Sequence, residues 1–110
     1  MASRITVEAP IATVINVFQT TPETQGELLA ILKSGTEARA VRQPGFISAN
    51  FHASSDGLRV VIYAQWETVE AWRTYMDDPE IRRGSERARS VAPADAHVYV
   101  VDSVYAPVKP

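Results

Sequence analysis

The chain has 110 residues, of which 45% are apolar and 22% are charged, and its formal net charge is −2. These values are typical of one soluble globular domain, and the slightly acidic balance argues against a protein that binds nucleic acid. The absence of cysteine excludes a disulfide, a thiolate zinc site and a cysteine nucleophile. We find no signal peptide and no apolar run long enough for a membrane span, so we expect a cytoplasmic protein.

The first half of the chain predicts a strand followed by a helix. Within residues 4–19, the β-branched and apolar run 11–18 favours a strand. A helix is then expected, with Thr21 as its N-cap and Pro22 at its first position. An apolar stripe with a period near 3.6 continues this helix until Pro44-Gly45 ends it.

The second half predicts a hairpin, two helices and a last strand. Residues 46–53 and 58–66 favour strands, and Asp56-Gly57 between them suits a tight turn because glycine accepts a positive φ. Two helices follow, from Thr68 to about Met76 and from Asp78-Pro79 to about Ser90. The final strand is expected over residues 96–105, before a frayed tail over 106–110.

This order of elements is that of the ferredoxin-like, split β-α-β fold, in which helices cover one face of a four-stranded antiparallel sheet. We therefore expect one α+β domain over residues 1–110, with an ordered core over about 11–105. Both sets of alternating side chains in the strands are largely apolar, yet the helices can cover only one face. The other face predicts a homodimer through sheet-to-sheet packing, a dimeric α/β barrel. The alternative is a monomer whose third helix folds over that face.

The even-numbered side chains of the strands are expected beneath the helices, where they form the wall of a small-molecule pocket. A mostly apolar cavity with a few polar groups is the usual form of such a site. The candidates on this wall, with two aromatic residues from the helix above, are Asn16, Phe18, Asn50, His52, Ile62, Trp66, Trp72 and Tyr75.

Each candidate has a chemical and a structural interpretation. His52 is either a general base or hydrogen-bond donor in the pocket, or an exposed residue beside the turn. Trp66 and Trp72 either contact a flat aromatic substrate or fill the core, and Asn16 needs hydrogen-bond partners if it is buried. His97 is interpreted as structural. No spacing indicates a metal site, and no glycine-rich phosphate loop indicates a tightly bound dinucleotide.

Several short motifs together resemble the antibiotic biosynthesis monooxygenase (ABM) family. They cover about residues 11–105 and are Ile15-Asn16-Val17-Phe18, Gln43-Pro44-Gly45-Phe46, His52 with Asp56-Gly57, and Tyr63-Ala64-Gln65-Trp66-Glu67. The resemblance implies a ferredoxin-like fold dimerised sheet to sheet, with one pocket per subunit between sheet and helices. Members of the family include cofactor-free oxygenases of aromatic polyketides, quinol oxygenases and heme-degrading oxygenases.

The chain departs from the family pattern at three points. Oxygenases of aromatic polyketides in this family often have Asn where this chain has Ile62, and the Arg expected on the last helix falls at Ser85. Heme-degrading members have a histidine on that helix, but residues 79–85 contain none, which argues against heme degradation.

We therefore expect a small monooxygenase that uses O₂ and no cofactor to oxidise an aromatic polyketide or a quinol-type substrate. The candidate catalytic residues are His52, Trp66 and Asn16, and the candidate substrate-binding residues are Phe18, Asn50, Ile62, Trp72 and Tyr75. The alternatives are a non-oxidative cyclase-like or aromatic ligand-binding protein, which Ile62 favours, and an interaction protein without turnover.

Overall fold

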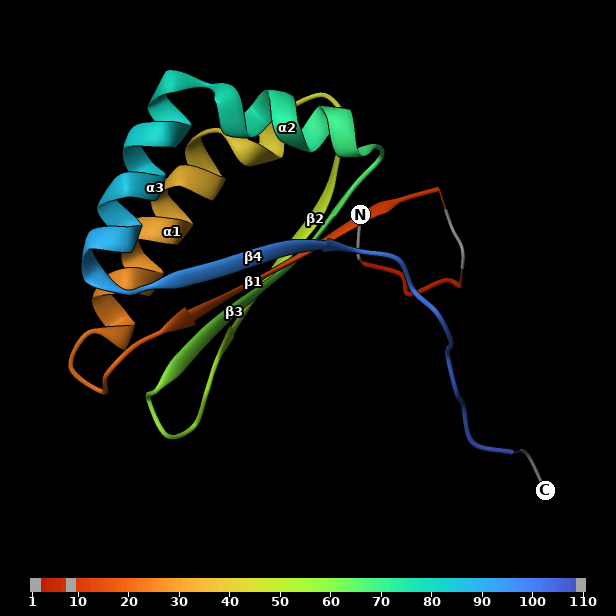
Figure 1. The fold of residues 1–110 in the computed structure, drawn as a ribbon, viewed down its shortest axis with the longest axis horizontal. Helices are drawn as coiled ribbons and strands as arrows, with labels where there is room; N and C mark the ends of the chain where they lie inside the picture. The colour runs from red at the N-terminus through yellow and green to blue at the C-terminus, as the bar shows by residue number, and fades with distance from the viewer. Residues whose placement is uncertain (1–2, 8–9, 109–110) are drawn as a thin grey trace.

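A computed structural model describes residues 3–7 and 10–108 and arranges them as a helical layer on a sheet (Figure 1). The predicted ferredoxin-like order of elements is confirmed. In chain order these are β1 (Ala12–Gln19), α1 (Gln25–Ala38), the short 3₁₀ helix η1 (Ala40–Arg42), β2 (Phe46–Ala53), β3 (Arg59–Trp66), α2 (Val69–Asp77), α3 (Pro79–Val91) and β4 (Ala94–Tyr99).

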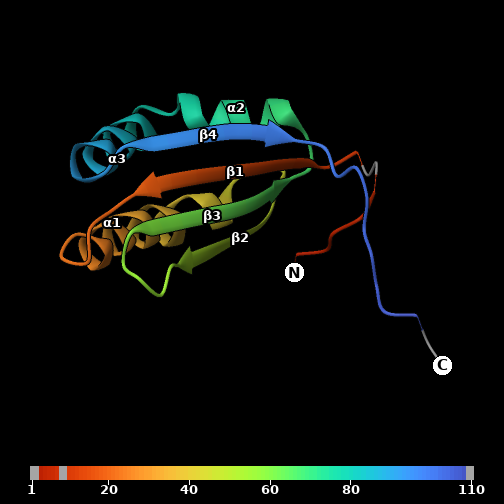
Figure 2. The same ribbon diagram turned by 60° about the horizontal axis from the view of Figure 1, so that its bottom comes forward.

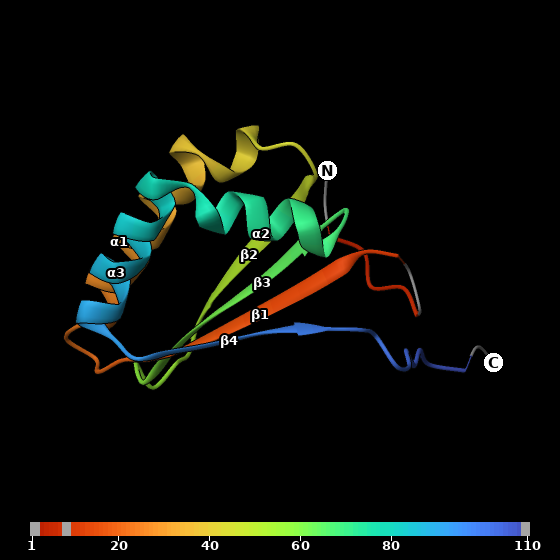
Figure 3. The same cartoon turned by 45° about the horizontal axis from the view of Figure 1, so that its top comes forward.

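The four strands form one antiparallel sheet in the order β2-β3-β1-β4, so β2 and β4 are its edges. All three α-helices lie on one face of this sheet (Figures 1 and 2). Helices α1 and α3 lie side by side at one end, whereas α2 crosses the other end (Figure 3). We call the face beneath the helices the helix face and the opposite one the outer face.

Side-chain caps fix the starts of α2 and α3, where the sequence predicts helix starts at Thr68 and at Asp78-Pro79. The hydroxyl of Thr68 accepts a hydrogen bond from the backbone N–H of Ala71 at 3.0 Å. The carboxylate of Asp78 accepts one from the backbone N–H of Glu80 at 2.8 Å, and Pro79 occupies the first turn of α3. Both caps satisfy N–H groups that a helix start leaves without an intrahelical partner.

Three predicted boundaries are wrong. Helix α1 ends at Ala38 instead of at Pro44-Gly45, and the separate 3₁₀ helix η1 follows it. Helix α1 begins at Gln25 instead of Pro22, because residues 21–24 first form a turn in which the backbone N–H of Thr21 donates to the hydroxyl of Thr24 at 2.9 Å. Strand β4 ends at Tyr99 instead of Tyr105. Tyr99 pairs with Thr13, one residue from the start of β1, so the following residues have no partner strand.

A β-bulge between Phe46 and Ser48 changes the phase of β2. Phe46 lies opposite Trp66, but Ser48 already lies opposite Gln65, so β2 contains one extra residue at this point. Because successive side chains of a strand alternate between faces, the extra residue moves all later side chains of β2 to the other face. The odd-numbered Ala49 and Phe51 therefore share the helix face with Ala64 and Ile62.

The same bulge overturns the expected positions of two site residues. Asn50 lies opposite Tyr63 and His52 opposite Val61, which puts both side chains on the outer face. The prediction that Asn50 and His52 line a pocket beneath the helices is wrong, since the even-numbered pattern holds in β1 and β3 only.

The buried core consists of two clusters that meet at Ile62, whose side chain packs against both. One cluster lies between α1, α3 and the sheet, and the other lies between α2 and the sheet. Their buried members are Phe18, Leu28, Val60, Ala88 and Ala92 in the first, and Ala12, Val14, Ala64 and Trp66 in the second.

We predict opposite effects of alanine at two glycines. Gly45 has φ +85°, and a Cβ there would lie 2.6 Å from the Cβ of Ala71. Gly45→Ala should therefore lower the free energy of unfolding by about 1–3 kcal/mol. Gly84 lies inside α3 with no atom within 4 Å of an added Cβ, so Gly84→Ala should raise it by about 1 kcal/mol. Urea unfolding measures both, and an unchanged midpoint for Gly45→Ala would contradict this account of the turn.

Candidate functional site

The candidate site lies on the helix face between the two core clusters, with Asn16 at its centre. Asn16 belongs to the central strand β1 and has Ile62 of β3 and Ala96 of β4 as its cross-strand neighbours. Its Oδ1 atom is buried and has no hydrogen-bond partner. A buried acceptor without a partner costs about 1–3 kcal/mol, so this atom indicates a place for a donor from a bound molecule.

The β4 side of the helix face is open. Ala96 lies opposite Asn16 and Val98 lies opposite Val14, so both side chains point toward the helical layer. Ala96 is nevertheless exposed, and Val98 keeps 39% of its surface exposed. The helices therefore cover β1 and β3 more fully than the β4 edge, where the cross-strand neighbour of Asn16 stays exposed. Figure 3 shows the helices above the sheet, with β4 at its edge.

An aromatic group forms the α2 side of the site. Trp66 is only 2% exposed, and its ring centroid lies 5.1 Å from that of Tyr75 and 5.4 Å from that of Phe46. The Phe46 ring meets the indole edge to face, at an interplanar angle of 81°. Trp72 and Tyr75 are three residues apart on α2, which sets them on one helical face, and both are half-buried. Trp66 is thus a fixed wall, while Trp72 and Tyr75 still present surface.

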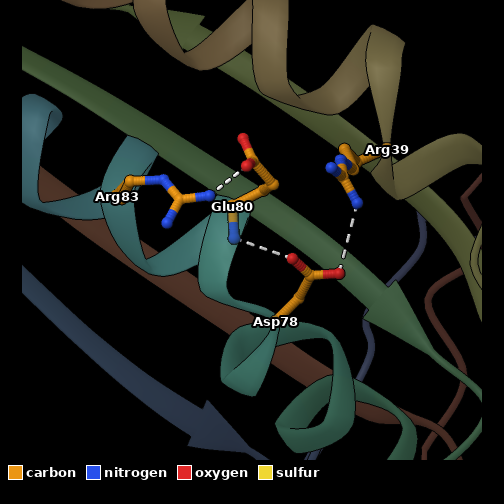
Figure 4. Close-up of polar contacts among 4 residues, drawn as sticks. All are labelled: Arg39, Asp78, Glu80 and Arg83. Atoms are coloured by element: carbon orange, nitrogen blue, oxygen red, sulfur yellow. Dashed lines mark hydrogen bonds and ion pairs between the residues drawn. The ribbon is translucent and has the colours of Figure 1, made fainter.

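Asp78 holds the three helices together beside this aromatic group (Figure 4). One carboxylate oxygen forms an ion pair with the Nη1 atom of Arg39, just beyond the end of α1, at 3.3 Å. The other oxygen caps α3, and the backbone N–H of Asp78 donates to the carbonyl of Tyr75 at 3.2 Å. On the next turn Glu80 pairs with Arg83 on the surface.

The phenol of Tyr75 is kept in its neutral form. Burial raises its pKa above the ordinary value of 10.0, the negative charge of Asp78 raises the pKa further, and Arg39 partly opposes both. A neutral phenol is a hydrogen-bond donor, so Tyr75 can donate to an oxygen atom of a molecule bound beside it.

The structure brings together five of the eight predicted site residues. Asn16 lies opposite Ile62, and Ile62 packs against the cluster that contains Trp66, Trp72 and Tyr75. Phe18 is 3% exposed and belongs to the core beneath α1 and α3.

The other two predicted residues lie on the outer face. The amide of Asn50 donates to the carbonyl of Tyr63 at 3.2 Å and to the hydroxyl of Ser3 at 2.5 Å, which is a structural role. His52 is exposed. His97 also lies on this face, where its Nε2 atom is 2.7 Å from a carboxylate oxygen of Asp95.

Sequence reasoning did not include Ala96 and Val98 on the open side, or Arg39 and Asp78 beside Tyr75. The alternation of side chains along β4 indicates that Ala96 and Val98 share one face of the sheet. No pattern in the sequence links Arg39 to Asp78, because 39 positions separate them.

A surface hollow lies away from this site. It has a volume of about 540 Å³ and follows the free edge of β2. A much smaller one lies at the end of β1 near Thr13 and Val101. Neither of these two hollows borders Asn16 or Trp66.

Two further properties concern residues 3–7 and 10–108. No three histidine, aspartate or glutamate side chains in these ranges come together in a way that could hold a metal ion. None of the helices formed by these residues has the length and apolar character that crossing a membrane requires.

Comparison with known proteins gives consistent results for sequence and fold. Residues 11–87 match the family model described as "Antibiotic biosynthesis monooxygenase". Over 80 residues the chain is 42% identical to Tetracenomycin-F1 monooxygenase of Streptomyces glaucescens, covering 73% of this chain and 71% of that protein.

Solved structures share the fold. A monooxygenase from the gene ActVA-Orf6 of Streptomyces coelicolor, solved with the ligand nanaomycin D, has a TM-score of 0.74 and 31% identity, covering 89% of this chain and 92% of that one. SnoaB of Streptomyces nogalater, described as a cofactor-independent oxygenase, has a TM-score of 0.71 and 21% identity, covering 87% of this chain and 97% of that one. The similarity to SnoaB concerns the fold alone.

We predict that Asp78→Asn lowers the pKa of Tyr75, because the substitution removes a negative charge that raises it and leaves Arg39 unpaired nearby. Asparagine is also a good N-cap, so α3 should keep its start. NMR of tyrosine labelled at Cζ measures the pKa directly. Glu80→Gln is the matched control, because it removes a carboxylate two positions away that does not act on Tyr75.

The raised pKa of Tyr75 also predicts how the stability of the fold depends on pH. The pKa of Tyr75 is higher in the folded than in the unfolded chain, so this residue makes the folded state lose stability as pH rises above about 10, where the unfolded phenol ionises first. A pKa of Tyr75 that does not fall in Asp78→Asn would contradict the assigned role of the carboxylate.

Proposed function

This chain belongs to the antibiotic biosynthesis monooxygenase family, and we propose that it is a small monooxygenase that oxidises an aromatic polyketide or quinol-type substrate with O₂ and no cofactor. The observation that carries the proposal is the buried, unpaired Oδ1 of Asn16 on the helix face, opposite Ile62, whose side chain also packs against the cluster that contains the aromatic residues. The 42% identity to a monooxygenase supports the same reaction class.

Oxidation without a cofactor requires a substrate that is its own reductant. An anthrone or hydroquinone loses a proton, and the resulting anion gives one electron to O₂. The substrate radical and superoxide then combine to form a C–O bond, and the resulting peroxide anion takes up a proton from solvent to give a hydroperoxide. Loss of water from the hydroperoxide leaves a carbonyl, so one oxygen atom enters the product and the other leaves as water. The protein must hold the anion, limit access of water and leave room for O₂.

The residues around Asn16 suit these tasks. Trp72 keeps apolar aromatic surface for a flat ring system next to the buried Trp66, and the neutral phenol of Tyr75 can donate to the developing anionic oxygen. The carboxamide of Asn16 can accept from a substrate hydroxyl and donate to an oxygen atom. The proton leaves toward solvent at the open β4 side, where Ala96 is exposed. His52 has no part in this proposal, because it lies on the outer face.

Asn16 compensates for the missing asparagine at position 62 in this proposal. Asn16 and Ile62 are direct cross-strand neighbours on the same face, and such neighbours have Cβ atoms about 4.5–5.5 Å apart. The chain thus offers a carboxamide one strand away from the position at which the family's polyketide oxygenases often carry it.

The test is oxygen uptake with a panel of anthrones, naphthols and hydroquinones and no added cofactor. Wild type should consume O₂, and Asn16→Leu should lower kcat/KM about a hundredfold, as expected for the loss of one group that stabilises the anion. The double variant Asn16→Ile with Ile62→Asn, which exchanges the two side chains, should regain most of that loss. His52→Ala is the control on the outer face and should leave uptake unchanged.

A non-oxidative role is the second candidate, because Ile62 replaces a polar group of the family's polyketide oxygenases. In that role the protein would bind an aromatic polyketide and orient it for cyclisation. No O₂ uptake, combined with quenching of tryptophan fluorescence by the same compounds, would overturn the oxygenase proposal in favour of this one.

We also propose that the protein is a homodimer whose outer faces pack together. The centre of this face is apolar and consists of Ile15, Val17, Val61 and Tyr63, all half-buried. Polar residues of β2 and β4 lie on either side of this centre, including Asn50 and His97. An apolar centre with a polar rim is the usual composition of an interface.

Val61→Asp should therefore weaken self-association at least about tenfold, because it places an unpaired charge in the contact. Sedimentation equilibrium measures the dissociation constant. Thr74→Asp, an exposed position on α2, is the control and should leave association unchanged. A dissociation constant that is the same for Val61→Asp and wild type would contradict packing through the outer face.

A further inference from the structure

Cross-strand neighbours on the helix face form rows that run from β2 across β3 and β1 to β4. The row through Asn16 consists, in this order, of Phe51, Ile62, Asn16 and Ala96. Its covering by the helices changes along its length, because the first three residues are half-buried whereas Ala96 is exposed. The row is therefore most open at its β4 end.

The two neighbours of Asn16 in this row differ in size and in packing. Ile62 packs against both core clusters, so it closes the β3 side of the carboxamide. Ala96, on the other side, carries only a methyl group and stays exposed. Directly opposite residues of an antiparallel pair have Cβ atoms about 4.5–5.5 Å apart, so a molecule that donates to the Oδ1 of Asn16 lies close to both neighbours. Any part of it that extends from Asn16 toward the open side passes over Ala96.

The small side chain at position 96 is a local conflict. Strands favour β-branched and aromatic side chains, and alanine is depleted in them. The next residue of β4 on the same face is Val98, which shows that the edge accommodates a β-branched side chain. A larger apolar residue at position 96 would also bury more apolar surface beside Asn16. Conflicts of this kind are expected at functional sites.

We propose that Ala96 is a specificity-determining residue of the candidate site, whose small side chain admits substrates with several fused rings that extend from Asn16 over the β4 edge. A single-ring hydroquinone can form a hydrogen bond with Asn16 without extending over β4, so it depends less on the size of residue 96. This inference rests on the proposed function because it requires binding at Asn16. It concerns the size of the substrate and is independent of the use of O₂.

Oxygen uptake with two compounds of different size tests the role of Ala96. Ala96→Leu adds three carbon atoms at the β4 edge. It should lower kcat/KM for the three-ring compound anthrone at least about tenfold and change that for hydroquinone less than about twofold, because steric exclusion acts only on the part that extends over β4. Ala96→Ser keeps the side chain small and should retain the wild-type ratio of the two values.

The matched control is Ala53→Leu, the same substitution on the other edge strand. Ala53 is also exposed and also lies on the helix face, but it belongs to β2 and lies opposite Val60. Two strands separate it from β4, so Ala53→Leu should leave the ratio of kcat/KM for anthrone and hydroquinone unchanged.

A second readout does not depend on turnover. Quenching of tryptophan fluorescence gives the dissociation constants of anthrone and hydroquinone. Ala96→Leu should raise the constant for anthrone at least about tenfold and leave that for hydroquinone nearly unchanged. If wild type consumes no O₂ but Ala96→Leu changes binding in this way, the reaction is contradicted and the role of Ala96 stands.

The remaining outcomes overturn the inference. An equal loss for both compounds in Ala96→Leu means that the substitution disturbs the site as a whole and does not select by size. An unchanged ratio in Ala96→Leu, with normal activity, means that substrates do not extend over β4. A wild type that neither consumes O₂ nor shows quenching with either compound overturns the site at Asn16 and the role of Ala96 together.

Discussion

The register between β1 and β3 is the constraint on which the rest of the structure depends. It pairs Ala12 with Trp66, Val14 with Ala64 and Asn16 with Ile62, so that the even-numbered residues of both strands face the helices. A slip of one residue would turn the buried indole of Trp66 to the outer face and bring Gln65 beneath α2. The two core clusters, the aromatic wall and the position of Asn16 all follow from this one pairing.

The features that could be predicted from the sequence were those that local chemistry decides. The caps at Thr68 and Asp78, the glycine turn at Gly57 and the order of the strands depend on residues close together in the chain. The bulge in β2 was missed because the alternation was counted from Phe46 without a break. The residues after it gave a signal, since Ser48, Asn50 and His52 are polar whereas Ala49 and Phe51 are apolar. Without a break in the alternation, these three polar side chains would have lain in a row beneath the helices, which is inconsistent with an apolar core.

The site could be predicted where it lies on β1, β3 and α2, because no bulge shifts the alternation of side chains in β1 and β3. The ion pair between Arg39 and Asp78 was not, because it joins two helix ends whose approach is set by packing. The same packing divides the core in two and leaves the Oδ1 of Asn16 unpaired between the clusters. A leucine there would join the clusters and add stability, so the asparagine is a local conflict of the kind that marks functional sites.

Strand β4 contributes residues both to the candidate site and to the proposed dimer contact. Its helix-facing residues Ala96 and Val98 line the open approach to Asn16, and its outer-facing residues His97 and Tyr99 lie at the rim of the proposed dimer contact. As an edge strand it is held by β1 alone along one side. The residues after β4, 100–108, form no helix or strand, so the pairing with β1 alone sets the position of β4 in the sheet. The outer face and the helix face, although separated by the sheet, are in this way joined through a single strand.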